Sequence, residues 1–246
     1  MKRTIIITGA AGGIGTALSK HMAALDWKVG MIDVNPQVEV LAEEIDGDTI
    51  GVICDLRDSG EVDAAIEKIE QALGPVDALI NNAGIVANIS STANMSDKRW
   101  SNELAVNLSA PFYFIRRLAP KMAARGWGRI INISSAAARS GLPAQIGYAA
   151  TKSALWGITA NTASEYGAKG VTCNSILPGI IATPTVLSMP QQIIKSAMQS
   201  NSLKRFGEPQ EVAHLVAFLC SEKAAFITGA EIDIDGGFRL NNQSIT

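Results

Sequence analysis

Short apolar runs alternate with longer stretches of helical periodicity along the whole chain. The runs are rich in Ile and Val, as in Ile5-Ile6-Ile7, and a continuous apolar run of this kind is typical of a strand buried on both faces of a sheet. The pattern predicts strands at residues 3–8, 28–33, 49–54, 76–81, 129–133, 171–177 and 231–234.

Between these runs, apolar residues recur every three or four positions, as Ile14, Leu18 and Met22 do, which predicts amphipathic helices. Asp58 and Glu61 resemble a capping box at the start of one of them. Helices are predicted at residues 14–25, 38–44, 62–73, 99–124 and 148–166, with another opened by Pro209 and a less regular segment at 183–201.

This regular alternation is typical of parallel strands joined by right-handed helical crossovers. The sequence therefore predicts an α/β fold, a doubly wound, seven-stranded parallel sheet with helices on both faces. No repeat or linker divides the 246 residues, so we interpret residues 1–246 as a single domain.

Charge and cysteine content exclude several classes of function. The formal net charge is −2, and no basic cluster indicates a nucleic-acid partner. Three cysteines lack metal-ligand spacing, and His21 and His214 have no carboxylate or Cys partner nearby in sequence, so we expect no metal site. No apolar run approaches the roughly 18 residues of a membrane span, and the N-terminal run is too short for a signal peptide. We therefore expect a cytoplasmic protein with no membrane partner.

A glycine-rich turn, residues 8–15, lies between the first strand and its helix. Glycine permits a tight turn and close approach of backbone to ligand, and the helix start offers unpaired N–H groups to a pyrophosphate. Asp33 follows about 20 positions later, where a carboxylate can accept hydrogen bonds from a ribose 2′-hydroxyl and repel a 2′-phosphate. This pattern favours NAD over NADP as cofactor; the alternative is a solvated Asp at a strand end. The residues assigned to the turn are Gly9, Gly12, Gly13, Ile14 and Gly15.

Tyr148 and Lys152 are four residues apart and therefore share one face of a predicted helix. A neighbouring ammonium group favours the phenolate and lowers the pKa of the Tyr, which makes it a usable acid and base near neutral pH. Ser135 lies 13 residues before Tyr148 at the end of a predicted strand, and that spacing favours it over its neighbour Ser134. The alternative for Tyr148 and Lys152 alone is an amphipathic Tyr packed under a solvated Lys.

Taken together, these elements resemble the short-chain dehydrogenase/reductase family in its compact, single-domain Rossmann branch. The resemblance runs from the glycine-rich turn to Gly237, almost the whole chain. It implies a catalytic role for Asn107, Ser135, Tyr148 and Lys152, with Tyr148 as proton donor or acceptor and Asn107 holding a water that relays protons from Lys152. The further residues implied to bind the cofactor are the adenine-contacting pair Asp55 and Leu56, the crevice residues Asn82, Ala83 and Gly84, and the nicotinamide segment Pro178, Gly179, Ile181 and Thr183.

The family keeps a mobile lid where this chain has residues 183–201, and the surrounding side chains are mostly apolar. Asn88 and Gln145 are the neutral polar residues expected there, and Arg139 is expected to face solvent or a neighbouring subunit rather than an anionic substrate. Gln145 stands where hydroxybutyrate dehydrogenases of the family carry a carboxylate-binding Lys. We therefore expect an uncharged, fairly apolar secondary alcohol or ketone as substrate.

Three further expectations follow from the resemblance. The likeness is greatest to 3-oxoacyl-ACP reductases, but these usually take NADPH, so Asp33 argues against that activity and for NAD-linked oxidation. Small residues on the two long helices, in a family where these helices form a subunit contact, predict a homotetramer. A non-catalytic NAD-binding scaffold on the same fold is the alternative from a different functional class.

Overall fold

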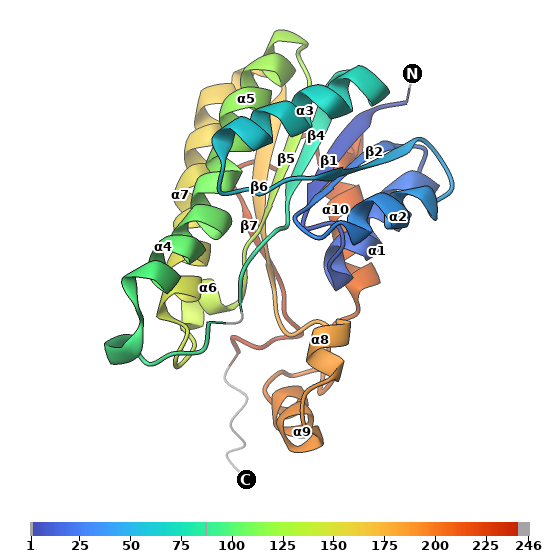
Figure 1. Cartoon of the computed structure of the whole chain (residues 1–246). Coiled ribbons are helices and arrows are strands. Elements are labelled where there is room, and N and C mark those ends of the chain that lie inside the picture. Colours follow the sequence, from blue (N-terminus) through green and yellow to red (C-terminus); the bar gives the residue numbers. More distant parts are fainter. Residues whose placement is uncertain (1, 87, 241–246) are drawn as a thin grey trace.

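The computed structural model describes residues 2–86 and 88–240, which form a single-domain Rossmann fold around a seven-stranded, wholly parallel sheet (Figure 1). The strand order is β3-β2-β1-β4-β5-β6-β7. Successive strands are therefore added toward one edge of the sheet from β1 to β3 and toward the other edge from β4 to β7. The strands are β1 (Thr4–Thr8), β2 (Lys28–Asp33), β3 (Thr49–Ile53), β4 (Val76–Asn81), β5 (Gly128–Ile133), β6 (Val171–Pro178) and β7 (Glu231–Ile234).

Side chains alternate between the two faces of the sheet and feed two separate hydrophobic clusters. On β1, Ile5 and Ile7 enter one cluster and Ile6 enters the other, and all three are fully buried. The first cluster packs under α1 (Gly13–Ala24), α2 (Gln37–Glu43) and α10 (Pro209–Cys220). The second packs under α3 (Ser59–Leu73), α5 (Ala110–Ala124) and α7 (Ile146–Tyr166). The predicted doubly wound architecture is therefore confirmed.

The predicted long helix at 99–124 is interrupted in the structure. It consists of α4 (Asp97–Leu104), a π-helical turn η2 (Ala105–Ser109) and then α5. The π-turn is a single turn between two helical stretches, and the sequence pattern did not separate it from them. Such turns are common at functional sites, and this one contains Asn107.

The irregular segment 183–201 folds as two helices, α8 (Pro184–Leu187) and α9 (Gln191–Gln199). Both lie beyond the carboxyl ends of the strands, at the bottom of Figure 1. The hydroxyl of Thr183 caps α8 by accepting a hydrogen bond from the Val186 N–H at 3.4 Å. The remaining helical elements are α6 (Ala137–Ser140), η1 (Thr92–Asn94), η3 (Gly167–Lys169) and η4 (Glu222–Ala224).

Only half of the predicted capping box at α3 forms. Asp58 caps the helix by accepting from the N–H groups of Gly60 at 2.7 Å and Glu61 at 3.3 Å. The Glu61 carboxylate instead accepts from the N–H of Asp55 at 2.8 Å, and so stabilises the loop after β3.

A buried chain of polar side chains crosses three neighbouring strands. The Asn81 amide on β4 donates to Asn132 on β5 at 2.8 Å, Asn132 donates to Thr159 on α7 at 2.8 Å, and Thr159 pairs with Ser175 on β6 at 2.7 Å. All four residues are at most 3% exposed. These hydrogen bonds fasten α7 to the sheet in one register, because a slip would leave buried polar groups without partners.

Within residues 2–86 and 88–240, no helix has the length and apolar character needed to cross a membrane. In the same ranges, no group of three or more His, Cys, Asp or Glu side chains is arranged to hold a metal ion.

Candidate active site

A cavity of about 1190 Å³ opens at the carboxyl ends of the strands, beside the point where the strand order reverses. Ligand sites of doubly wound sheets lie at this position. Every residue assigned to the site from the sequence lines the cavity except Asn107. These lining residues are Gly9, Gly12, Gly13, Ile14, Gly15, Asp33, Asp55, Leu56, Asn82, Ala83, Gly84, Ser135, Tyr148, Lys152, Pro178, Gly179, Ile181 and Thr183.

The glycine-rich turn leaves no room for side chains. A Cβ atom at Gly15 would lie 2.1 Å from the carbonyl oxygen of Gly9, and one at Gly13 would lie 2.9 Å from the Thr183 side chain. Gly9 also has a φ of 64°, which favours glycine. The N–H groups of Gly13 and Ile14 belong to the first turn of α1, where a helix supplies no acceptor. This backbone cradle fits an anionic phosphate group.

Asn82 fixes the glycine-rich turn from the neighbouring strand. Its amide donates to the carbonyl oxygens of Thr8 at 2.9 Å and Gly9 at 3.1 Å. In return, the Thr8 hydroxyl accepts from the N–H groups of Asn82 at 3.0 Å and Ala83 at 3.1 Å. The loop after β4 therefore holds the glycine-rich turn in one conformation.

Two carboxylates line the cavity at the ends of β2 and β3. Asp33 accepts hydrogen bonds from the N–H groups of Ala11 and Asn35, each at 3.0 Å, and is only partly buried. Asp55 is bound by Arg57, and that guanidinium holds the pKa of the carboxyl below its usual range. Leu56, which follows Asp55, is buried.

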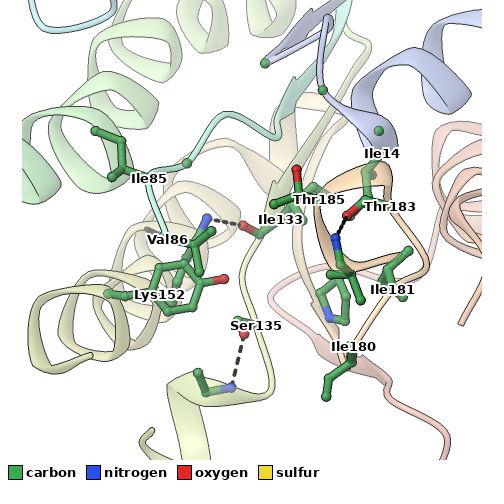
Figure 2. A pocket seen from close by; sticks show the side chains of 18 of the residues that line it. Ile14, Ile85, Val86, Ile133, Ser135, Lys152, Ile180, Ile181, Thr183 and Thr185 are labelled. Carbon is green, nitrogen blue, oxygen red and sulfur yellow. Dashed lines mark hydrogen bonds between the residues drawn. The ribbon is translucent and has the colours of Figure 1, made fainter. Parts of the chain in front are cut away.

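Tyr148 and Lys152 lie on α7 and face the cavity together. The Lys152 ammonium lies 5.9 Å from the centroid of the Tyr148 ring and donates to the Ile133 carbonyl at 2.7 Å. Figure 2 shows this bond, with Ser135 on the adjoining loop. The predicted shared helix face therefore exists, and it faces the crevice.

Burial dominates the protonation of both groups. It raises the pKa of the Tyr148 phenol, an effect opposed by a hydrogen bond with Ser135. It also lowers the pKa of the Lys152 ammonium to about 8. The expectation that Lys152 lowers the pKa of Tyr148 is thus not met by the chain's own groups, because the cost of burying a phenolate is larger than what its neighbours supply.

The two adjacent serines have different partners. Ser134 is buried, and its hydroxyl donates to the backbone carbonyl of Lys152 at 2.8 Å. The Ser135 hydroxyl accepts from the Ala137 N–H at 3.1 Å and makes the hydrogen bond with Tyr148. Ser134 therefore anchors the helix, whereas Ser135 interacts with the Tyr148 phenol.

Asn107 is fully buried behind the cavity wall. Its side-chain oxygen accepts from the Ile85 N–H at 2.7 Å, and its amide nitrogen donates to the Ile85 carbonyl at 3.0 Å and the Thr151 hydroxyl at 3.2 Å. The side chain thus binds backbone in both directions and fixes the loop after β4 against α7.

Of the two neutral polar residues expected near the substrate, Gln145 lines the cavity and Asn88 does not. Arg139 does not line the cavity; its side chain is 32% exposed and forms an ion pair with Glu231 at 2.7 Å. Cavity residues that the sequence did not reveal come from α9, the C-terminal segment and the loop after β3: Arg57, Gln192, Ser196, Ser200, Phe206 and Phe238.

The two histidines, far apart in sequence, meet between α1 and α10. The rings of His21 and His214 lie 4.9 Å apart, edge to face. Burial, and then the charge of His214, lower the pKa of His21.

The family follows from comparison with known proteins. A family model described as enoyl-(acyl carrier protein) reductase matches residues 9–239. The chain belongs to the short-chain dehydrogenase/reductase family. Members of this family are oxidoreductases that act on alcohol and carbonyl groups with a nicotinamide cofactor, and within it the chain is similar to 3-oxoacyl-ACP reductases.

Three relatives resemble the chain over nearly its whole length. Nodulation protein G of Azospirillum brasilense is 39% identical over 248 residues, covering 98% of this chain and 99% of the relative. Acetoacetyl-CoA reductase of Cupriavidus necator is 34% identical, covering 97% and 99%. The 3-oxoacyl-[acyl-carrier-protein] reductase FabG of Staphylococcus aureus is 31% identical, covering 98% and 99%.

Proposed function

We propose that this short-chain dehydrogenase/reductase transfers a hydride between NAD(H) and an uncharged, fairly apolar secondary alcohol or ketone. The observation that carries the proposal is the convergence of Tyr148, Lys152 and Ser135 on one cavity with the glycine-rich turn and Asp33.

The residues present fit a dinucleotide. The cradle of residues 9–15 suits the pyrophosphate, and Asp33 offers carboxylate oxygens where a 2′-phosphate would be repelled. Asp55 and Leu56 would hold the adenine, Asn82, Ala83 and Gly84 would line the crevice, and Pro178, Gly179, Ile181 and Thr183 would hold the nicotinamide amide. When bound, the nicotinamide supplies or accepts the hydride.

Tyr148 is proposed as the general acid and base. Because burial raises its pKa, the phenol is protonated at neutral pH, the form that donates a proton to a carbonyl oxygen. Removing a proton from an alcohol requires added positive charge, for which Lys152 and the oxidised nicotinamide are the sources. Ser135 would bind the reacting oxygen and orient it. Asn107, whose side chain is committed to Ile85, would hold the relay water through the backbone of its π-turn.

The substrate end of the cavity supports an uncharged ligand. The charged residues among the described lining are Asp33, Asp55, Arg57 and Lys152, and the first three lie at the dinucleotide end. The substrate end is lined by apolar residues with neutral polar groups between them: Leu142, Gln145, Ile180, Val186, Met189, Gln192, Ile193, Ser196, Ala197, Phe206 and Phe238. We assign residues 183–201, with α8 and α9, as the lid over this end.

We also propose a cytoplasmic homotetramer. Trp156 on α7 is 52% exposed and Phe112 on α5 is 47% exposed, and apolar side chains at such levels on the two long helices suit a subunit contact. The three cysteines are buried free thiols, which fits a reducing compartment.

A second candidate activity is the reduction of a 3-oxoacyl thioester on acyl carrier protein or CoA. The printed functions of two relatives, acetoacetyl-CoA reductase and 3-oxoacyl-[acyl-carrier-protein] reductase, favour it. Rates with acetoacetyl-CoA and NADH or NADPH, compared with those for small ketones, distinguish the two candidates.

The deciding experiment measures NAD reduction with a panel of uncharged secondary alcohols, using the native chain and Tyr148→Phe. We expect turnover by the native chain and a loss of at least about 10²-fold in the variant, the contribution of a positioned general base. Full activity of Tyr148→Phe would remove the Tyr from its role. Tight NADH binding without turnover of any alcohol, ketone or thioester would instead favour the non-catalytic scaffold.

A further inference from the structure

Arg57 makes an unusual set of contacts for an exposed side chain. It lies in the loop between β3 and α3, and its guanidinium donates from Nε to both carboxylate oxygens of Asp55, at 2.9 and 3.0 Å. Its Nη2 donates to the same carboxylate, and the Arg57 backbone N–H donates to Asp55 at 3.0 Å. Its Nη1 donates to the Asn102 side chain on α4 at 3.1 Å. One side chain therefore joins two segments that are 45 residues apart.

Arg57 and its two partners line the cavity. Asp55, Arg57 and Asn102 are neighbours there of Leu56, at the dinucleotide end. Among the lining residues described, Arg57 and Lys152 are the cations, and Lys152 belongs to the catalytic end. The Asp55–Arg57–Asn102 bridge thus forms part of the wall against which the proposed adenine pocket is built.

Fold stability alone does not explain this bridge. The Asp55 and Arg57 side chains are 30% and 54% exposed, and exposed ion pairs contribute little to stability. A comparable pair, Arg117 with Asp63, joins α5 to α3 with side chains 49% and 28% exposed, but neither residue lines the cavity. The chain therefore contains a matched pair of guanidinium–carboxylate contacts, one in the cavity wall and one outside it.

We propose that Arg57 is a cofactor-positioning residue, which clasps the Asp55–Leu56 loop to α4 and so holds the adenine end of the dinucleotide site. This inference rests on the proposed nicotinamide-dinucleotide function. The clasp holds the Asp55 carboxylate in one orientation, because the backbone N–H, Nε and Nη2 of Arg57 all donate to it.

Calorimetric titration tests the proposal by measuring binding affinity directly, without catalytic turnover. NADH, ADP-ribose and nicotinamide mononucleotide are titrated into the native chain, Arg57→Ala, Arg57→Lys, Asn102→Ala and the control Arg117→Ala. Arg57→Ala is expected to weaken NADH and ADP-ribose binding roughly tenfold, the loss typical of one charge-assisted contact. Nicotinamide mononucleotide, which lacks adenine, is expected to bind unchanged. Arg57→Lys keeps the positive charge but lacks the planar guanidinium that donates to two partners at once, so it should recover only part of the affinity. Asn102→Ala should lose less NADH affinity than Arg57→Ala.

Equal NADH affinity in Arg57→Ala and the native chain would overturn the inference. So would an equal loss for nicotinamide mononucleotide, or an equal loss in Arg117→Ala, because each would indicate a general perturbation. Thermal melting checks that Arg57→Ala is folded, and Arg57→Lys carries the test if it is not. Failure of the native chain to bind NADH, NADPH or ADP-ribose at all would instead refute the proposed function.

Discussion

Asp33 carries the proposed cofactor preference, but it also has a structural task. Its carboxylate accepts hydrogen bonds from the N–H groups of Ala11 and Asn35. Replacing Asp33 by Ala therefore removes the negative charge and also destabilises the glycine-rich turn. Asp33→Asn keeps an acceptor oxygen and removes the charge. We expect both Asp33→Ala and Asp33→Asn to shift the NAD/NADP ratio of catalytic efficiency toward NADP by about tenfold or more, because the like-charge repulsion is gone.

The measurement is kcat/KM for each cofactor at a fixed alcohol concentration. The matched control is Asp58→Asn, which changes a carboxylate that caps α3 and does not line the cavity. An unchanged ratio in both Asp33 variants would remove Asp33 from its role in cofactor choice.

The contribution of the buried Asn107 side chain to stability can be tested, because it forms hydrogen bonds with the backbone of Ile85. Asn107→Ala leaves the Ile85 N–H and carbonyl without their partners, which is expected to lower the free energy of unfolding by about 1–3 kcal/mol. Urea denaturation measures this loss, and activity should fall with it as the Ile85 loop moves. Asn94→Ala, at an exposed position, should change the unfolding free energy by less than about 0.5 kcal/mol. Equal stability of the two variants would contradict the assigned role.

Individual residues could be predicted from the sequence where they stand at fixed spacing in a motif. Ser135, Tyr148 and Lys152 are of this kind, and all three line one cavity. The direction of the Tyr148 pKa could not be predicted, because it depends on how deeply the phenol is buried, which no local pattern records. Arg57 was missed because its significance comes from its contact with Asn102, which lies on α4, 45 residues later in the sequence.

At the scale of elements, the packing of α1 on α10 predicts a pH-dependent stability. Burial and His214 lower the pKa of His21 below 6.5, so in the window beneath that value the unfolded state binds more protons than the folded state. Stability is therefore lost as pH falls through 6.5 toward the lowered pKa. The titratable groups that interact at this contact are the two histidines and Glu211, whose carboxylate interacts electrostatically with His214.

His214→Gln removes the second charge and should reduce the fall in melting temperature between pH 7.5 and pH 5.5. The two proteins should melt alike at pH 7.5, where the lowered pKa leaves the His21 imidazole neutral. An identical fall in both would show that this contact does not contribute to acid sensitivity.

Strand positions were predicted to within a residue or so, because fully buried parallel strands have a strong apolar signal. The elements that were missed have weaker signals. The π-turn at Ala105–Ser109 is only five residues long, and the two helices of the proposed lid are short and mostly exposed. Their form depends on tertiary contacts, such as that between Thr183 and the glycine-rich turn.

For the whole molecule, the homotetramer remains a prediction. Trp156→Glu places a charge on the exposed face of α7 and should lower the mass measured by light scattering after size exclusion, because burying an unpaired charge in a subunit contact is costly. Val40→Glu on α2, 46% exposed in the native chain, should leave the mass unchanged. A tetramer that survives Trp156→Glu would exclude this face as the contact.

The series of hydrogen-bonded side chains Asn81, Asn132, Thr159 and Ser175 limits which substitutions this sequence can accept. Changing any one member to an apolar residue leaves a buried neighbour without its partner, whereas changing two partners together can be almost neutral. Evolutionary drift at these four positions is therefore expected to be concerted, with homologues keeping the whole set or replacing linked members together. Natural variants with a single replacement should be rare for reasons of folding, and their rarity should not be mistaken for a sign of catalysis.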